Sequence, residues 1–227
     1  MIDSPFSEHI AFAEKSAGEE AGFSLFPEEL AILSPNAVEK RRREFFLGRA
    51  AAHAAIGSLL GASLAPVLKG KQGEPIWPAG LVGSIAHSSD IAVAAVGKKH
   101  HFPGIGLDVE SRERSVSLNI SRHLCTPGEQ EWVMESGGEA HEKLKMLFSA
   151  KEAIFKAFYP IEDVFLSYKD AELSWDNARG GFAGQLRKQA GHAFPSGYTM
   201  RVGCRLLEKY IFSYICLPAE TTIVGGI

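Results

Sequence analysis

The 227-residue sequence has few cysteines and lacks any long apolar run. Cys125, Cys204 and Cys216 are odd in number and form no Cys-x-x-Cys pair, which disfavours a zinc site and predicts free thiols in a reducing compartment. No apolar segment reaches the ~18–20 residues that a membrane-spanning helix requires. Residues 1–5 lack the basic and apolar regions of a signal peptide, so we expect a cytoplasmic protein without a membrane span.

The sequence also lacks a large excess of charge of either sign, since its formal net charge is −3. The charges are unevenly distributed. Residues 1–39 carry eight acidic side chains against one lysine, a balance of −7, and residues 40–71 carry seven basic side chains against Glu44, a balance of +6. A local basic block in a mildly acidic chain favours a discrete anionic ligand over a long nucleic acid. A solvated helix face remains the alternative for each basic residue.

Apolar periodicity predicts a mixed α/β chain. We expect helices at about 36–60, started by Ser34-Pro35 and capped by Gly61, at 126–135, and at 139–159, stopped by Pro160. Residues 1–33 show no clear period, and residues 61–80 are expected to form an extended loop. Strands are expected at 81–87, 91–96, 104–110, 171–175, 181–186, 198–206 and 210–217. This order predicts two related α/β halves, residues 1–103 and 104–227.

The helix expected at 139–159 carries a narrow polar stripe beside a broad apolar face. Lys145, Ser149, Glu152 and Lys156 form this stripe, spaced by four, three and four residues. On a solvated surface, Glu152 and Lys156 would be an exposed i,i+4 ion pair worth about 0.3–0.5 kcal/mol. The alternative is a functional site shared with an acidic strand end upstream.

That strand end is the segment GIGLDVE at 104–110. A strand places Asp108 and Glu110 on one face and Val109 on the other. Two neighbouring carboxylates repel each other unless a cation, a basic side chain or solvent relieves them. Oxygen ligands without a nearby Cys or His pair favour Mg²⁺ or Mn²⁺ over zinc. A solvent-facing acidic strand end is the alternative.

Three features could bind an anion. Arg41 and Arg49 lie eight residues apart, about 80° around a helix, so they can meet one ligand only from a shared flank. The loop KGKQG at 69–73 offers two lysines and two glycines, but it does not have Walker-A spacing. His87 ends a strand and can donate to a phosphate oxygen, or it is a partly buried histidine bonded locally. The histidines at 100–101 are expected to form a solvated turn rather than a metal site.

The segment GIGLDVE at 104–110, followed by FSAKEAIFKA at 148–157, resembles the two signature motifs of 4′-phosphopantetheinyl transferases. The likeness is to the two-lobed Sfp and EntD type, which serves siderophore, nonribosomal peptide and polyketide carriers. Segments 40–42, 45–49, 68–70, 75–78 and 82–87 are also similar, and the resemblance covers about residues 35–170. It implies a pseudo-twofold α+β fold in which each half is a small antiparallel sheet with a long helix. Coenzyme A would lie between the halves.

The resemblance implies a role for each matched residue. Asp108, Glu110 and Glu152 would hold Mg²⁺, for which Mn²⁺ can substitute, and the catalytic residues would be Asp108, Glu152 and Lys156. The 3′-phosphate of coenzyme A would contact Arg41, Arg49 and His87, and its adenine and phosphates would lie along Lys69, Gly70, Lys71 and Gln72. Its pyrophosphate would meet Asp108, Glu152 and Lys156. Ala86 and Leu166 would lie beside the cofactor and its pantetheine arm.

The resemblance also implies a partner, because the nucleophile would be a serine of an apo carrier protein, whether acyl, peptidyl or aryl. We expect a monomeric enzyme. Two positions depart from the family pattern, since Val109 stands where some relatives have an acidic or polar residue and His53 where close relatives have an arginine. Two alternatives remain: another Mg²⁺-dependent enzyme acting on a nucleotide phosphoanhydride, and a non-catalytic carrier-binding or nucleotide-sensing module. Glu152 and Lys156 disfavour the module.

Overall fold

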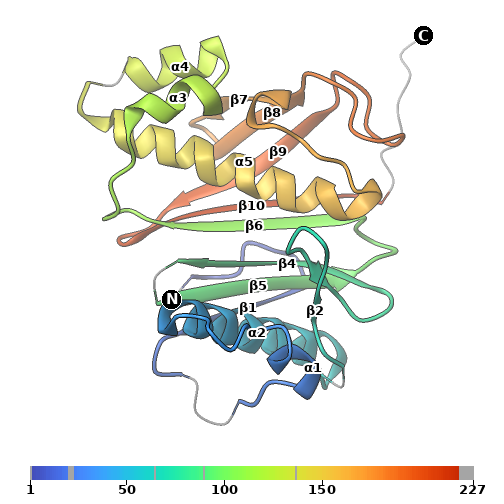
Figure 1. The fold of residues 1–227 in the computed structure, drawn as a ribbon. Coiled ribbons are helices and arrows are strands. Elements are labelled where there is room, and N and C mark those ends of the chain that lie inside the picture. The colour runs from blue at the N-terminus through green and yellow to red at the C-terminus, as the bar shows by residue number, and fades with distance from the viewer. Residues whose placement is uncertain (1, 20–22, 64, 89, 136, 220–227) are drawn as a thin grey trace.

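The structure is a computed structural model that describes residues 2–19, 23–63, 65–88, 90–135 and 137–219. Two antiparallel sheets lie between two long helices (Figure 1). The strand orders are β1-β5-β4 in a three-stranded sheet and β6-β10-β9-β8-β7 in a five-stranded sheet, and β2 pairs with β3 in a small hairpin. The predicted α+β fold, in which each half is an antiparallel sheet with a long helix, is confirmed.

The N-terminal half combines the three-stranded sheet with helix α2. Its elements are β1 (Ile10–Ser16), α1 (Pro27–Leu30), α2 (Glu39–Leu60), β2 (Leu68–Lys69), β3 (Pro75–Ile76), β4 (Leu81–Ser88) and β5 (Ile91–Lys98). Small residues of α2 pack against the sheet, among them Ala51 and Ala55, which are fully buried with Ala94 and Val96. Gly61 ends α2 with φ +85°, the left-handed conformation predicted for its cap.

The C-terminal half places helix α5 (Ala140–Glu162) across the five-stranded sheet (Figure 1). The strands are β6 (Gly104–Ser111), β7 (Ala171–Asp176), β8 (Gly181–Leu186), β9 (Thr199–Leu206) and β10 (Tyr210–Leu217). Two shorter helices, α3 (Ser121–Leu124) and α4 (Pro127–Met134), precede α5. Thr126 and Glu129 form the predicted capping box of α4.

The two sheets share a core between them. Apolar side chains of β4 and β5, such as Val82 and Val93, pack there with Ile105, Leu107 and Phe212 from the five-stranded sheet. One polar contact crosses this layer: Leu107 N donates to Ser84 Oγ at 3.0 Å. The halves are therefore joined through β4 and β6, and the helices cover the outer faces.

The N-terminal segment has more structure than its sequence indicated. β1 pairs with β5 in antiparallel register from Ile10 opposite Gly97 to Ser16 opposite Ile91. Apolar residues point to both sides of this strand: Ala11 and Ala13 pack towards α2, and Phe12 packs into the layer between the sheets. Its apolar residues therefore do not alternate with polar ones, which is why the sequence shows no clear period here.

Two helix ends differ from the prediction. α2 begins at Glu39 after Val38 rather than at Ser34-Pro35, because the Arg42 side chain donates to the carbonyl oxygens of Ala37 and Pro35 and holds the preceding residues in a turn. α5 continues through Pro160 to Glu162 and ends at Asp163, which has φ +52°. A proline fixes φ at a helical value and removes one donor, which this last turn tolerates.

Other features follow the sequence more closely. Among the described residues, no helix is both long and apolar enough to cross a membrane. Cys125, Cys204 and Cys216 are free thiols, as predicted. Burial raises the pKa of each of the three thiols, to about 11 for Cys125 and Cys204 and about 12 for Cys216, so none is a reactive thiolate near neutral pH.

Candidate functional site

Strand β6 directs its acidic end towards helix α5. A side chain at Gly106 would collide with the backbone oxygen of Ala153, and one at Gly104 with that of Ala157. The glycines therefore let the helix backbone lie directly against the strand. By strand alternation, Asp108 and Glu110 continue along the same face beside α5.

Val109 points the opposite way. It is buried in the layer between the sheets, next to Leu107 and Phe212. A side chain at this position does not reach the face that carries Asp108. Val109, which departs from the family pattern, therefore belongs to the core and not to the acidic site.

The polar stripe of α5 faces β6 and its neighbours. Lys145 is buried, and its Nζ donates to the backbone oxygens of Ser111, Arg112 and Arg114 at 3.2, 2.5 and 3.2 Å. Lys156 Nζ lies 2.8 Å from Asp108 Oδ1. Among the ion pairs of the described residues there is none between Glu152 and Lys156, so the solvated i,i+4 pair is not what this stripe forms.

Glu152 has a partner that the sequence did not reveal. The hydroxyl of Tyr168 donates to Glu152 Oε1 at 2.5 Å. Burial and the negative charge of Glu152 hold the pKa of Tyr168 well above its usual value, so this hydroxyl stays a donor. The Tyr168 ring also lies near Phe148, one helical turn before Glu152, with centroids 6.0 Å apart. Tyr168 therefore fixes the orientation of the Glu152 carboxylate.

The two carboxylates of β6, Asp108 and Glu110, lie in surroundings that would favour a bound cation. Asp108 is only 6% exposed, and its Oδ2 is buried without a hydrogen-bond partner. Burial, and then the negative charge of Asp108, raise the pKa of Glu110 from 4.5 to about 7. Glu152 adds to this repulsion, whereas Lys156 and Arg114 reduce it. A bound cation would relieve both the unpaired oxygen and the repulsion, so these residues fit a divalent metal.

The three acidic residues are not gathered into a finished metal cage. Within the part of the chain that the structure describes, no three Asp, Glu, His or Cys side chains are close enough together to hold a metal ion. Lys156 neutralises Asp108, and Tyr168 holds Glu152. The donors suit Mg²⁺ or Mn²⁺, and two of them, Asp108 and Glu152, have these other partners.

A small basic pocket lies at the N-terminal half, with a volume of about 110 Å³. Its lining includes Arg41, Arg49, Lys69 and His87, together with Glu44. Arg41 and Arg49 do converge from one flank of α2, as the helical spacing required. Glu44 was not predicted to line a pocket. The sequence does place it one helical turn after Lys40, with which it forms an ion pair at 3.7 Å.

Arg49 is held from several sides. Its Nη2 donates to Leu68 O at 3.2 Å, its Nε lies 3.7 Å from Glu29 Oε1, and its guanidinium carbon stands 4.5 Å from the centre of the Phe45 ring. Burial lowers the pKa of Arg49, while the Glu29 carboxylate opposes this. The side chain is therefore a fixed cation at the edge of the basic pocket.

His53 does not take part in that pocket. Its Nε2 lies 2.8 Å from Glu29 Oε1 and its Nδ1 lies 2.6 Å from Ser63 Oγ. Glu29 is fully buried and also accepts from the backbone N–H groups of Val67 and Phe26. His53 thus joins α1 to α2, and it is not among the residues that line the basic pocket.

His87 lies between the basic pocket and the acidic end of β6. Burial lowers its pKa, Glu44 opposes this, and the positive charges of Lys156 and Arg41 lower it further. Its Nδ1 lies 3.9 Å from Glu44 Oε2. A neutral imidazole at this place can donate one hydrogen bond to an anion.

Two further pockets continue from the basic pocket. A cleft of about 370 Å³ between the halves is lined by residues of the β2–β3 hairpin, β4, β6 and α5, including Gln72, Ala86, His87, Asp108, Glu152 and Lys156. Beyond Glu152, an apolar pocket of about 390 Å³ is lined by Phe155, Phe165, Leu166 and Tyr168. The cleft shares His87 with the basic pocket and Glu152 with the apolar pocket.

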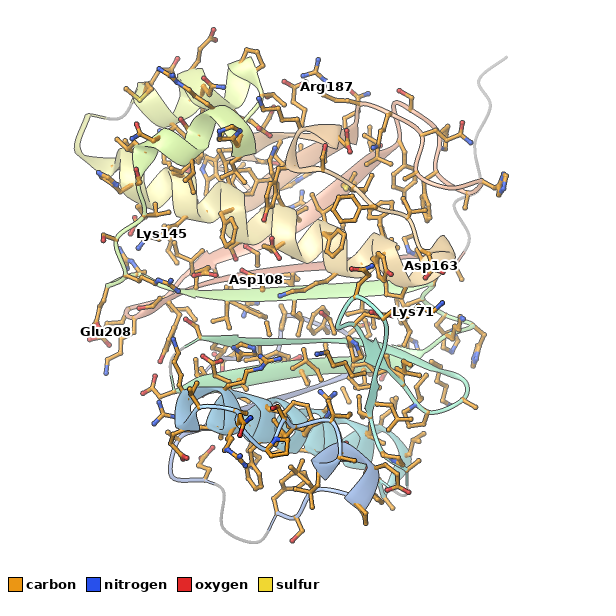
Figure 2. All side chains as sticks on the ribbon, in the orientation of Figure 1. Lys71, Asp108, Lys145, Asp163, Arg187 and Glu208 are labelled. Atoms are coloured by element: carbon orange, nitrogen blue, oxygen red, sulfur yellow. The ribbon has the colours of Figure 1, made fainter. Side chains whose placement is uncertain are left out.

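The structure brings most of the predicted residues to these three pockets. Gly70 turns the β2–β3 hairpin, where its N–H donates to Glu74 O and a side chain would collide with Glu74. Lys71 is exposed on the hairpin (Figure 2) and lines none of the three pockets. Glu110 lies on β6 beyond Asp108 and does not line the cleft. Tyr168, Glu44 and Glu29 are not among the site residues that the sequence predicts.

Comparison with known proteins shows the family of this chain. Residues 27–97 match the 4′-phosphopantetheinyl transferase N-terminal domain, and residues 104–215 match the 4′-phosphopantetheinyl transferase superfamily. The 4′-phosphopantetheinyl transferase PptT of Mycobacterium tuberculosis is 32% identical over 179 residues, 79% of this chain and 77% of its own. Svp of Streptomyces mobaraensis, another 4′-phosphopantetheinyl transferase, is 37% identical over 164 residues, 71% of this chain and 65% of its own.

Among solved structures, the holo-[acyl-carrier-protein] synthase of Thermotoga maritima is similar over 52% of this chain and 65% of its own, with a TM-score of 0.42 and 22% identity. The two family matches divide between the half that holds the basic pocket and the half that holds the acidic end of β6. With PptT matched over more than three quarters of both chains, the protein belongs to the 4′-phosphopantetheinyl transferase family.

Proposed function

We propose that this protein transfers the 4′-phosphopantetheine group of coenzyme A to a serine of an apo carrier protein and releases adenosine 3′,5′-bisphosphate. One observation carries the proposal: a single cleft between the halves is lined by Asp108, Glu152 and Lys156 on one side and by His87 and Gln72 on the other. A phosphoanhydride in that cleft would meet acidic metal ligands, the ammonium group of Lys156 and neutral hydrogen-bond donors together.

The order of the three pockets supports assigning each to one part of coenzyme A. The basic pocket would take the 3′-phosphate on Arg41, Arg49 and His87, because charge-assisted bonds to a dianion are strong. The hairpin from Lys69 through Gly70 and Lys71 to Gln72 would follow the adenine and phosphates, beside the backbone of Ala86. The apolar pocket that includes Leu166 would take the pantetheine arm.

A divalent cation would be held by Asp108, Glu110 and Glu152. Mg²⁺ is the expected ion, and Mn²⁺ could replace it, since both prefer oxygen ligands. When bound, it would neutralise the charge of the pyrophosphate. The buried free oxygen of Asp108 and the raised pKa of Glu110 support this assignment.

The chain's own residues account for the proton and the leaving group. Glu152 would remove the proton from the serine hydroxyl, whose oxygen then forms a bond to the phosphorus next to pantetheine while the bond to adenosine bisphosphate breaks. Lys156 would neutralise the charge that develops on the departing phosphate. Glu152 is suited to this role because it lies between the cleft and the apolar pocket.

We further propose a division of work between residues 1–103, which bind the phosphates of coenzyme A, and residues 104–227, which hold the metal and the catalytic groups. Residues 220–227 lie outside the described part of the chain. We expect the enzyme to act as a monomer in the cytoplasm on more than one type of carrier, in siderophore, nonribosomal peptide or polyketide synthesis. Free cysteines support a reducing compartment.

Incubation with coenzyme A, Mg²⁺ and a panel of apo acyl, peptidyl and aryl carriers tests the proposal. Mass spectrometry should show phosphopantetheine added to carrier serine, and the Glu152→Gln protein serves as the control. Cleavage of coenzyme A without any modified carrier would instead support another enzyme of phosphoanhydrides. Binding of coenzyme A without any reaction would support a non-catalytic module.

A further inference from the structure

Asp108 has a positively charged partner at the place where a metal ion is proposed to bind. Lys156 Nζ contacts Asp108 Oδ1 at 2.8 Å, while Asp108 Oδ2 is buried without a hydrogen bond. The ammonium group therefore pairs with one of the two carboxylate oxygens. The other oxygen has no hydrogen-bond partner in the described part of the structure.

The surroundings strengthen the effect of this lysine. The Asp108 side chain is 8% exposed and that of Lys156 29%, so water screens their interaction only weakly. The positive charges of Lys156 and Arg41 both act on His87, which lines the same cleft. A divalent cation that approaches Asp108 without a phosphate ligand would thus meet an ammonium group that already contacts the carboxylate.

We infer that Lys156 makes cation binding at Asp108 conditional on a phosphate ligand in the same cleft. The inference rests on the proposed function, since it takes Asp108 as a metal ligand. Without phosphate, the ammonium neutralises Asp108 and repels a second cation. When the phosphates of coenzyme A enter, the ammonium can turn to them, and Asp108 then offers both oxygens to the cation.

Such coupling must be reciprocal. If coenzyme A raises the affinity for the cation by some factor, the cation raises the affinity for coenzyme A by the same factor. Lys156 would thereby favour joint loading of metal and coenzyme A over binding of the metal alone. This role is separate from any contact that Lys156 makes during the transfer of the phosphopantetheine group.

The test is a titration with Mn²⁺, followed by the electron paramagnetic resonance signal of the free ion, with and without coenzyme A and without carrier. Lys156→Met removes the charge and keeps much of the side-chain length. It should bind Mn²⁺ alone roughly tenfold more tightly than the unmodified protein, within the range typical of coupled sites, and coenzyme A should then add less. Lys156→Arg keeps the charge and should behave like the unmodified protein.

Lys169→Met provides a matched control, because it removes an exposed lysine that does not line the cleft. It should leave Mn²⁺ affinity unchanged. Lys156→Gln gives a second neutral variant should Lys156→Met fail to fold. The melting temperature provides a second measurement: Mn²⁺ alone should raise it more in the neutral variants than in the unmodified protein.

Neutral variants that bind Mn²⁺ alone no more tightly than the unmodified protein would overturn the inference. Asp108→Asn distinguishes this failure from failure of the metal assignment. If Asp108→Asn binds Mn²⁺ normally in the presence of coenzyme A, the proposed metal site is wrong. If Asp108→Asn weakens Mn²⁺ binding while the neutral Lys156 variants do not strengthen it, only the coupling is wrong.

Discussion

Lys151, next to Glu152 on α5, forms a buried ion pair with Glu129 of α4, with Nζ 2.7 Å from Oε2. Lys151 Nζ also donates to the carbonyl oxygens of Leu124, Tyr168 and Ala171. Glu129 in turn accepts from the backbone N–H groups of Thr126 and Leu173. This pair therefore joins α3, α4 and β7 to α5, and it anchors the backbone of Tyr168, whose hydroxyl holds Glu152.

Lys151→Met should strongly destabilise the protein. It leaves Glu129 charged and buried without its cation, which typically costs about 3–5 kcal/mol. The free energy of unfolding in urea measures the loss, and exposed Lys169→Met should change it by no more than about 0.5 kcal/mol. The double variant Lys151→Met with Glu129→Gln should recover part of the stability, because no charge is then left buried. A loss below about 1 kcal/mol in Lys151→Met would show that the pair is not needed.

Gly106→Ala should separate α5 from β6. The added methyl group would collide with the backbone oxygen of Ala153, so the helix that carries Glu152 must move. We expect a lower melting temperature and a loss of transferase activity. Gly57→Ala is the matched control, since the same methyl group meets no atom within 4 Å and α2 should gain up to about 1 kcal/mol. A Gly106→Ala protein as stable and active as Gly57→Ala would contradict the close packing.

Some of this site could be predicted because its residues follow regular periods. Strand alternation placed Asp108 and Glu110 together, and helical spacing placed Lys156 on the stripe beside them. Tyr168 could not be found in this way, because it reaches Glu152 from a short 3-10 helix 16 residues further along the chain. The same holds for Glu29, which reaches His53 over 24 residues. Contacts between residues of different elements depend on tertiary packing, which no local period records.

The raised pKa of Glu110 predicts how stability depends on pH without metal. Burial and the charge of Asp108 raise this pKa from 4.5 to about 7, so the folded protein binds the proton more tightly than the unfolded chain. The stabilisation from Glu110 should be present below about pH 4.5 and lost as the pH rises to about 7. Urea unfolding at several pH values, in the presence of a chelator, measures this loss. Glu110→Gln should remove this part of the pH dependence, and an unchanged profile would contradict the assignment.

Arg41→Ala should distinguish coenzyme A from its form without the 3′-phosphate. Loss of a charge-assisted hydrogen bond costs about 1.5–3 kcal/mol, or roughly 10- to 100-fold in affinity. Calorimetry should show that loss for coenzyme A and little change for 3′-dephospho-coenzyme A. Arg43→Ala is the matched control, because Arg43 is exposed on the same helix and does not line the basic pocket. Equal losses of affinity for both ligands in Arg41→Ala would show that Arg41 does not bind the 3′-phosphate.

Asp108→Asn and Glu152→Gln should fail in different ways. Asp108 has one free buried oxygen and is proposed only as a metal ligand, so its amide variant should lose activity through metal affinity. Raising Mg²⁺, or replacing it with Mn²⁺, should then restore activity in part. Glu152 is proposed as both ligand and base, and it lies where the cleft meets the apolar pocket.

Glu152→Gln should therefore stay about 10²–10⁴-fold below the unmodified enzyme even at saturating metal, which is the usual contribution of a general base. Calorimetry with coenzyme A should show that this variant still binds the co-substrate, which separates a lost base from a collapsed site. The glutamine can still accept the hydrogen bond from Tyr168, so the side chain should keep its orientation. If added metal restores Glu152→Gln as fully as Asp108→Asn, Glu152 is only a ligand and another group takes the serine proton.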